Sequence, residues 1–127
     1  MSLLTKLEIN SVRNIEKVEL NLDPRLNMIF GVNGSGKTSI LESVHLLATG
    51  RSFRTPKTES IITDASPELT IYAETGLQSG IGLSKSRNKK HKLKFDSKLQ
   101  RNWDLVARAL PVQVISAISF LLLEGGP

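Results

Sequence analysis

The chain contains no cysteine, only two histidines and few aromatic residues, which make up 5% of its 127 positions. Without cysteine there is no disulfide, thiolate metal site or cysteine nucleophile, which agrees with a reducing compartment. The two histidines, His45 and His91, are too few for a metal site, and we expect His45 to be a packing or surface residue. No run approaches the roughly 18 consecutive apolar residues of a membrane span. We therefore expect a cytoplasmic protein with no membrane partner.

Positive charge is present, but it is concentrated in one segment. Residues 85–101 carry eight basic side chains and one acidic side chain, a local charge of +7 in a chain whose net charge is +5. Such a segment would suit DNA phosphates, although it lacks the interleaved aromatic residues on which single-stranded bases stack. A solvated basic hairpin is the alternative. The candidate DNA contacts are Lys85, Arg87, Lys89, Lys90, Lys92 and Lys94.

Apolar periodicity predicts an α/β fold. Alternation predicts an N-terminal antiparallel ribbon, and a later β-hairpin follows a polar loop. Ile40, Val44 and Leu47 recur at helical spacing and predict the buried stripe of a helix that Gly50 caps at its C-terminal end. The expected strands are residues 3–11, 18–22, 26–30, 69–76, 80–84, 92–95 and 112–115, and the expected helices are 37–49 and 103–110. We expect 26–30 to be buried, because its apolar run leads directly into Gly31.

Residues 31–38 read Gly-Val-Asn-Gly-Ser-Gly-Lys-Thr and match G-x-x-x-x-G-K-[ST] at every fixed position. Glycines let such a loop curl around phosphates and aim backbone N–H groups at them, and the following helix adds its N-terminal dipole. Lys37 would reach the outer phosphates and the Thr38 hydroxyl would hold Mg²⁺. A connecting glycine turn is the alternative; a dinucleotide fingerprint is rejected, because it has no use for the Gly-Lys-Thr run. The sequence thus predicts ATP and Mg²⁺ as cofactors, and the candidate nucleotide-binding residues in this loop are Gly31, Val32, Asn33, Gly34, Ser35, Gly36, Lys37, Thr38 and Ser39.

Three motifs in order resemble the RecF family of bacterial DNA replication and repair proteins, which have ATPase heads of the ABC and SMC type. They are Arg13, Asn14 and Ile15 after the first strand, the phosphate loop with Asn33, and residues 50–55 after the helix. The resemblance implies ATP-dependent binding of single-stranded or gapped duplex DNA, a DNA-dependent ATPase, recombination mediator proteins as partners, and a position for Arg13 beside the nucleotide. The chain departs from the family at Val12, usually Phe, and at residues 117–119, where Pro and acidic residues are usual.

The resemblance makes residues 1–127 the N-terminal part of an ATPase head: a P-loop NTPase half with a ribbon and a hairpin. We find neither the second apolar strand that ends in a catalytic carboxylate nor a signature segment. The apolar run ending at Glu124 only imitates that strand. We therefore assign no catalytic residue and expect ATP to bind without turnover. The apolar residues 120–123 lead us to expect a homodimer.

Other interpretations stay open. A small-molecule P-loop kinase is one alternative, and a DNA-binding module with a vestigial phosphate loop is another. Arg13 could be a solvated arginine at a strand end rather than a phosphate contact. Arg51 and Arg54 could face either the phosphate loop or a DNA backbone.

Overall fold

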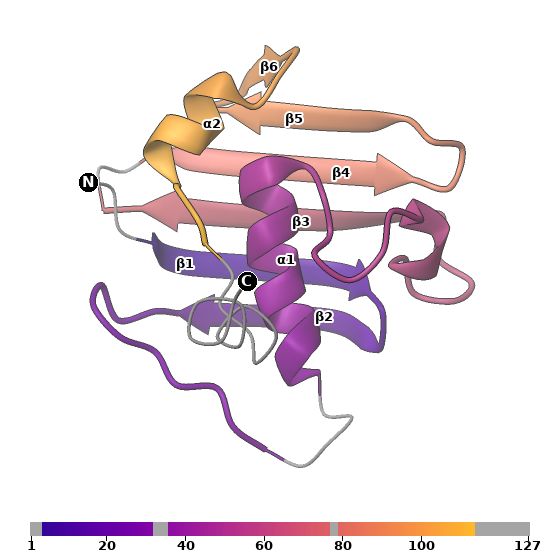
Figure 1. Ribbon diagram of the computed structural model, residues 1–127, viewed down its shortest axis with the longest axis horizontal. Coiled ribbons are helices and arrows are strands. Elements are labelled where there is room, and N and C mark those ends of the chain that lie inside the picture. Colours follow the sequence, from indigo (N-terminus) through magenta and orange to yellow (C-terminus); the bar gives the residue numbers. More distant parts are fainter. Residues whose placement is uncertain (1–3, 32–35, 77–78, 114–127) are drawn as a thin grey trace, which may run out of the picture.

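The computed structural model describes residues 4–31, 36–76 and 79–113, which form an antiparallel sheet of six strands with helices on one face (Figure 1). The strand order is β2-β1-β3-β4-β5-β6. All five neighbouring pairs along this order are antiparallel. The elements are β1 (Leu4–Val12), β2 (Ile15–Asn21), α1 (Lys37–Thr49), η1 (Thr58–Ser60), β3 (Glu68–Thr75), β4 (Gly80–Ser86), β5 (His91–Phe95), β6 (Lys98–Gln100) and α2 (Asp104–Ala109).

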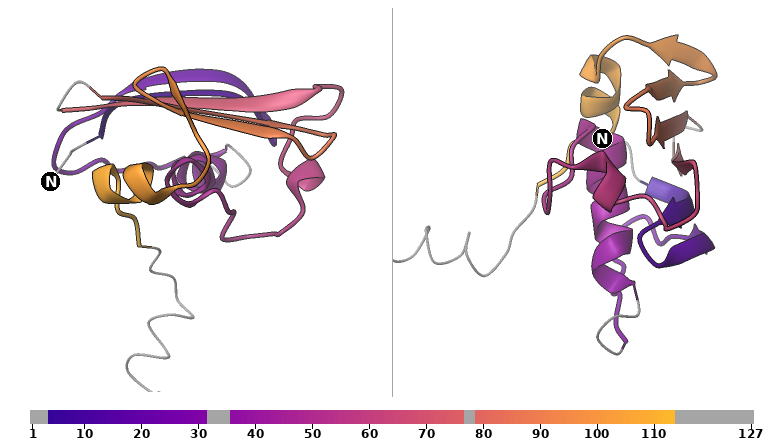
Figure 2. Two further views of the ribbon diagram at one scale, coloured as in Figure 1. Left: turned by 90° about the horizontal axis from the view of Figure 1, so that it is seen from above. Right: turned by 90° about the vertical axis from the view of Figure 1, so that its right-hand side faces the viewer.

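The core lies between the two layers that Figure 2 shows edge-on, the sheet and the helices. Strand alternation points one set of side chains toward α1 and leaves the other set on the outer face. The buried set runs across the sheet from strand to strand and consists of Leu7, Ile9, Leu69, Ile71, Ala73, Ile81, Leu83 and Leu93. The ribbon and the hairpin of residues 69–84 are confirmed, because β1 pairs with β2 and β3 pairs with β4.

The buried face of α1 is rotated from the predicted stripe. Ile40 and Val44 are only half-buried, while the buried residues are Ser39, Glu42, Ser43, Leu46, Leu47 and Ala48. The small Ser39 and Ser43 allow close approach to the sheet, and the Ser43 hydroxyl donates to the Ser39 carbonyl at 2.8 Å. The prediction is confirmed at Leu47, which is fully buried. Apolar spacing misplaced the rest of the stripe because the inward face carries a charged residue and two serines.

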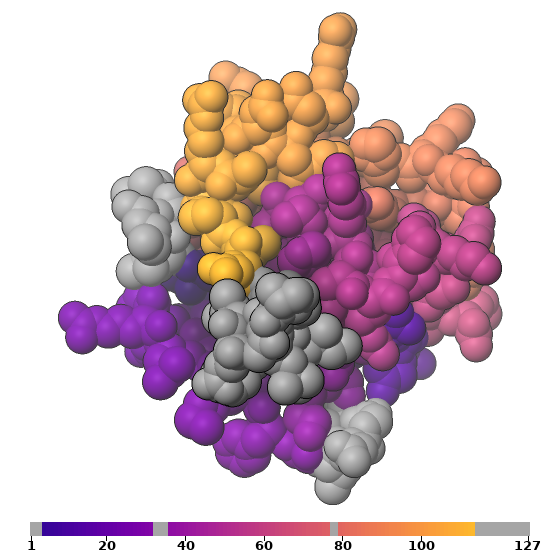
Figure 3. All heavy atoms as spheres, in the orientation of Figure 1, coloured from indigo at the N-terminus to yellow at the C-terminus, as the bar shows by residue number. Residues whose placement is uncertain are grey.

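The strand expected at residues 26–30 is wrong. Asp23 accepts hydrogen bonds from the backbone N–H groups of Arg25 and Leu26, and this turn leads the chain away from β2. Within the described residues the segment pairs with no strand, and Met28 and Phe30 are 79% and 87% exposed. Figure 3 shows purple atoms of this segment standing out at the lower left of the helix-covered face.

The C-terminal expectations fall mostly outside the described residues. Val112 and Gln113 are described and are not in a strand, whereas 114–115, 117–119 and 120–127 lie beyond them. The short strand β6 and the turn η1 were not predicted. No helix in the described ranges is long and apolar enough to cross a membrane.

Candidate nucleotide site

The end of the phosphate loop is fixed against the turn between β1 and β2. Gly36 has φ +95°, which favours glycine, and a Cβ built there would lie 3.3 Å from Ile15 Cγ1. α1 begins at the next residue, and the Gly36 carbonyl accepts the N–H of Ile40 at 3.0 Å. The geometry of a helix leaves its first N–H groups without intrahelical acceptors, and Gly36 has no side chain to cap them. This end of α1, with no acidic residue in its first turn, favours an anion.

Lys37 joins the two ends of the loop. Its Nζ donates to the Gly31 carbonyl at 2.5 Å. Residues 32–35 lie between these two positions and outside the described residues. A lysine on a flexible stem in this position can leave a carbonyl acceptor for a more strongly charged phosphate oxygen.

A cavity of about 300 Å³ opens at this end of α1. Its charged lining residues are all basic and come from three separate segments of the chain: the β1–β2 turn, the start of α1 and the loop after α1. The lining residues are Arg13, Asn14, Gly36, Lys37, Thr38, Ser39 and Arg54. The cavity therefore combines a positive lining with the positive end of a helix dipole.

The backbone of Arg13 is held rigidly beside this cavity. Arg13 has φ 51°, its N–H donates to the Ile61 carbonyl at 2.6 Å, and its own carbonyl accepts the Thr63 hydroxyl at 2.6 Å. An isolated bridge between Val12 and Ile62 extends this attachment. The turn that carries Arg13 is thus fixed by a segment fifty residues away in the sequence.

The Arg13 side chain is bound by Glu42, which is fully buried on α1. Arg13 Nε and Nη2 donate to the two carboxylate oxygens at 2.6 and 3.1 Å, a bidentate pair. The Ser52 hydroxyl donates to Oε2, and Arg54 Nη1 lies 3.5 Å from Oε1. Glu42 therefore holds both arginines that line the cavity.

The charges around Glu42 set its protonation. Burial raises the pKa of this carboxyl. Hydrogen bonds from Arg13 and Ser52 and the charges of Arg13 and Arg54 lower the pKa by more than burial raises it, so it lies below its ordinary value of 4.5. The same contact raises the pKa of Arg13. Glu42 is ionised in the folded chain at neutral pH.

The structure brings together five of the predicted nucleotide-binding residues: Arg13, Gly36, Lys37, Thr38 and Ser39. Gly31 is described and contacts Lys37, while Val32, Asn33, Gly34 and Ser35 lie outside the described residues. Arg13 is not a solvated strand-end arginine, because Glu42 binds it. Of the two arginines that could face the phosphate loop, Arg54 lines the cavity and Arg51 does not. Asn14, Glu42 and Ser52 were not predicted as site residues. The signal for Glu42 was its place on one helix face with Ser39 and Leu46, three residues before it and four after it.

The predicted DNA contacts do not share one surface. Lys85 Nζ donates to the Gly50 carbonyl at 2.9 Å at the C-terminal end of α1, and burial lowers its pKa. Arg87 donates to the Ser66 and Thr63 carbonyls at 2.7 and 2.9 Å. Lys89 and Lys90 are in the turn between β4 and β5, and Lys92 and Lys94 are exposed on β5. His45 is a packing residue, as expected: its ring meets Phe53 edge to face and Nδ1 lies 2.6 Å from the Arg51 carbonyl.

The fold is that of the P-loop NTPases. A family model described as an AAA domain matches residues 6–116. The chain therefore belongs to the AAA domain family.

Within this class the resemblance to RecF is confirmed. The chain is 38% identical over 128 residues to the DNA replication and repair protein RecF of Pseudomonas savastanoi pv. phaseolicola, and 39% identical to that of Stutzerimonas stutzeri. Each alignment covers 98% of this chain, which spans 35% of the length of these relatives.

Solved structures give the same fold. A RecF bound to ATP, a recombination mediator protein of the RecFOR pathway, matches with a TM-score of 0.76 at 21% identity, over 84% of this chain and 31% of that one. An SMC ATPase from work on ATP-driven dimerization matches with a TM-score of 0.79 at 13% identity, over 95% of this chain and 90% of that one. At these identities the likeness is one of fold.

Proposed function

We propose that this chain is the ATP-binding portion of a RecF-like DNA replication and repair protein that binds DNA in an ATP-dependent manner. The observation that carries the proposal is the cavity at the start of α1, whose described lining includes Arg13, Lys37, Thr38 and Arg54 and no acidic residue. A triphosphate carries negative charge, which would balance the positive charge of this lining. The RecF relatives and the RecF structure solved with ATP support the same ligand.

Mg²⁺ fits this proposal through Thr38. Mg²⁺ takes one or two protein ligands, several waters and the substrate's own phosphate oxygens, so a single hydroxyl is a sufficient contribution. Thr38 is exposed in the first turn of α1 and lines the cavity. The described residues contain no cluster of His, Asp or Glu that would hold a metal without a nucleotide. We propose that Mg²⁺ arrives with ATP and that the metal neutralises charge between its phosphates.

The partners that we propose are DNA, single-stranded or gapped duplex, other recombination mediator proteins, and a second copy of the chain. The relatives named as replication and repair proteins support DNA, and the RecF structure, that of a recombination mediator protein, supports the mediator partners. The ATP-driven dimerization of the structurally similar SMC ATPase supports the second copy. A cytoplasmic location follows from the same proposal, because ATP and the bacterial chromosome meet there.

ATP dependence of DNA binding is the experiment that tests this function. Fluorescence anisotropy of a labelled gapped duplex is measured against protein concentration with Mg²⁺ and ATP, with ADP, and without nucleotide. We expect the DNA affinity to rise with ATP and not with ADP. DNA affinity that is the same in all three conditions would support a DNA-binding module with a vestigial loop, and transfer of phosphate to a metabolite would support a kinase.

We also predict that the chain binds ATP without turning it over. Among the residues that the structure describes, no carboxylate lines the cavity to orient a water, and the nearby Glu42 is bound by Arg13, Ser52 and Arg54. Phosphate release with ATP and Mg²⁺, with and without DNA, checks this prediction. Steady release at about 1 s⁻¹, within the range of competent enzymes, would contradict it.

A further inference from the structure

The basic residues of the hairpin are divided between the two faces of the sheet. In the β4–β5 pairing, Lys92 lies opposite Ser84 and Lys94 opposite Gly82, while Leu83 and Leu93 pair in the core. Residues opposite each other share a face, so Lys92 and Lys94 lie on the outer face, away from the helices. One DNA backbone cannot contact the outer lysines and the helix side of the hairpin together.

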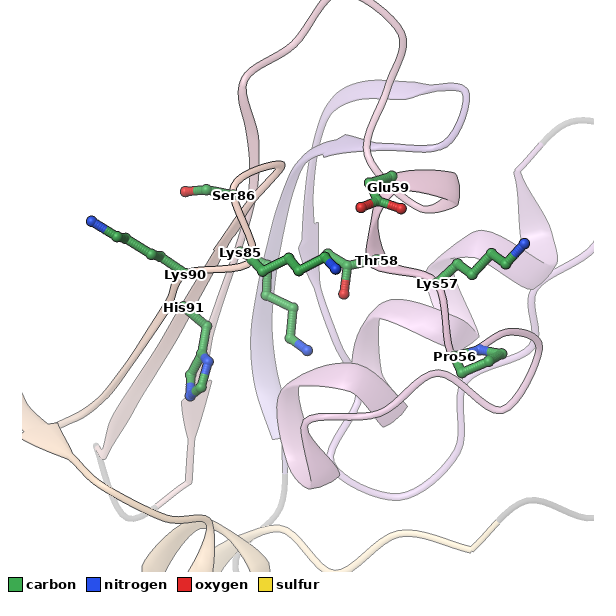
Figure 4. Close-up of a pocket in the computed structure, with 9 residues that line it drawn as sticks. Pro56, Lys57, Thr58, Glu59, Lys85, Ser86, Lys90 and His91 are labelled. Atoms are coloured by element: carbon green, nitrogen blue, oxygen red, sulfur yellow. The ribbon is translucent and has the colours of Figure 1, made fainter.

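A hollow of about 560 Å³ lies on the helix side, and we call it the hairpin hollow. Figure 4 shows its two walls: the segment from Pro56 to Glu59 on one side, and Ser86, Lys90 and His91 on the other. Its lining includes four lysines against one acidic residue, with the hydroxyls of two further residues. The lining residues are Pro56, Lys57, Thr58, Glu59, Lys85, Ser86, Lys89, Lys90 and His91.

The lysines of the hairpin hollow differ in their availability. Lys85 is held by the Gly50 carbonyl, whereas Lys57, Lys89 and Lys90 are exposed. Lys57 comes from the loop after α1, outside the basic run 85–101, so the charge count along the sequence did not include it. In the folded chain Lys57 therefore joins the basic residues on the helix side of the hairpin, whereas Lys92 and Lys94 lie on the outer face.

The hairpin hollow continues toward the cavity at the start of α1 where we propose that ATP binds, which we call the nucleotide cavity. A second hollow of about 410 Å³ shares Pro56, Thr58 and Lys85 with it and is lined by Arg51 and Arg54. Arg54 also lines the nucleotide cavity. The three hollows are thus linked by shared lining residues into a basic path along the helix side.

We propose that the two walls of the hairpin hollow bind backbone phosphates of DNA through Lys57 and Lys90, whose side chains extend outward from opposite walls (Figure 4), and that Lys92 and Lys94 on the outer face do not take part. This rests on the proposed function, because DNA is the anion concerned. Exposed lysines on flexible stems contact phosphates as point charges without reading sequence, and the Thr58 and Ser86 hydroxyls are suitable further donors. The DNA-contacting surface is thus formed by two separate chain segments, the loop after α1 and the β4–β5 turn, and not by the basic run 85–101 as a whole.

Two double variants of equal charge change test the proposal. Lys57→Glu with Lys90→Glu alters the hairpin hollow, and Lys92→Glu with Lys94→Glu alters the outer face. DNA affinity of the full chain is measured with ATP across a salt series, after thermal unfolding shows that both variants fold. We expect the hollow variant to lose affinity and its log-log salt slope to fall by about 1.8, or about 0.9 for each of two duplex phosphate contacts. The outer-face variant is expected to keep the wild-type slope.

The other outcomes are distinct from one another. A larger loss of DNA affinity in the outer-face variant, or equal losses in both variants, would overturn the assignment of the hairpin hollow as the DNA contact. The proposal of ATP-dependent DNA binding would remain. Wild-type slopes in both variants would also overturn it. A wild-type chain that binds ATP but no DNA would remove the DNA part of the proposed function, and the hollow with it.

Discussion

The carboxylate of Glu42 organises the charged side of the nucleotide cavity at the scale of single residues. It has no exposed surface, yet it is ionised, because two arginines and a serine hydroxyl replace the water that it has lost. In return it orients Arg13 and Arg54, which line the cavity. A phosphate entering the cavity meets arginines whose positions are already fixed.

Arg13→Leu tests this arrangement through stability. Removing the bidentate partner leaves a buried carboxylate with only Ser52 and the more distant Arg54, so we expect the free energy of unfolding to fall by about 3 kcal/mol. Urea denaturation measures it. Arg25→Leu, at an exposed position, is the matched control and should stay within about 0.5 kcal/mol of wild type. Equal stability of Arg13→Leu and Arg25→Leu would show that the Arg13–Glu42 pair is energetically unimportant. The double variant Arg13→Leu with Glu42→Leu should recover part of the lost stability.

The depressed pKa of Glu42 predicts how stability depends on pH. Because the folded chain binds this proton less tightly than the unfolded chain, the contribution of Glu42 is fully present above its ordinary pKa of 4.5 and is lost as the pH falls through the lower, folded value. Glu42→Gln lacks that contribution at every pH. The difference in unfolding free energy between wild type and Glu42→Gln should therefore shrink between pH 5 and pH 3, measured by urea denaturation. A difference that stays constant over this range would contradict the assignment.

At the scale of elements, α1 connects the two ends of the molecule that we assign to function. Its N-terminal end opens on the nucleotide cavity, and its C-terminal end is capped by Gly50, whose carbonyl accepts Lys85 from the hairpin hollow. Trp103 packs over this cap and donates from Nε1 to the Leu47 carbonyl at 2.9 Å. Contacts with distant segments thus hold the C-terminal end of α1 in place in the fold.

Gly50→Ala tests the C-terminal end of α1. Gly50 has φ +80°, and a Cβ there would lie 2.9 Å from Trp103 Cζ2, so the substitution meets both a left-handed backbone and a clash. We expect the unfolding free energy to fall by about 1–2 kcal/mol or more. Denaturation monitored by the fluorescence of the single tryptophan measures this loss. The control is Gly82→Ala, whose Cβ would be 3.9 Å from Tyr72 Cδ1. Equal stability of the two variants would show that Trp103 does not depend on this glycine.

Local pattern predicted the elements that depend on local pattern. The helix bounds 37–49 are confirmed, because the loop before α1 and Gly50 after it mark both ends. The pairing of the ribbon and of the β3–β4 hairpin follows from alternation. The segment 26–30 was misjudged because an apolar run forms a strand only beside a partner, and sequence does not name the partner. Glu42 was missed because its partners, Arg13 and Arg54, lie 29 and 12 residues away.

At the scale of the whole molecule, the sheet separates two chemically different faces. The helix side carries the nucleotide cavity, the hairpin hollow and the basic path between them, while the outer face of β5 carries Lys92 and Lys94. α1 has 13 residues and spans about 20 Å, so the ATP and DNA sites that we propose lie at opposite ends of one rigid element. Arg54 lines hollows at both the nucleotide cavity and the path. A ligand at one site therefore shares a side chain with the route to the other.

ATP binding at the start of α1 is the central claim, and calorimetric titration of ATP with Mg²⁺ tests it most directly. Wild type is compared with Lys37→Ala and with Lys17→Ala, which removes an equally charged, exposed side chain from β2. We predict that wild type and Lys17→Ala bind ATP alike and that Lys37→Ala binds at least about tenfold more weakly, a loss of about 1.4 kcal/mol. Equal affinity in wild type and Lys37→Ala, or no heat of ATP binding in wild type, would contradict the assignment of this cavity.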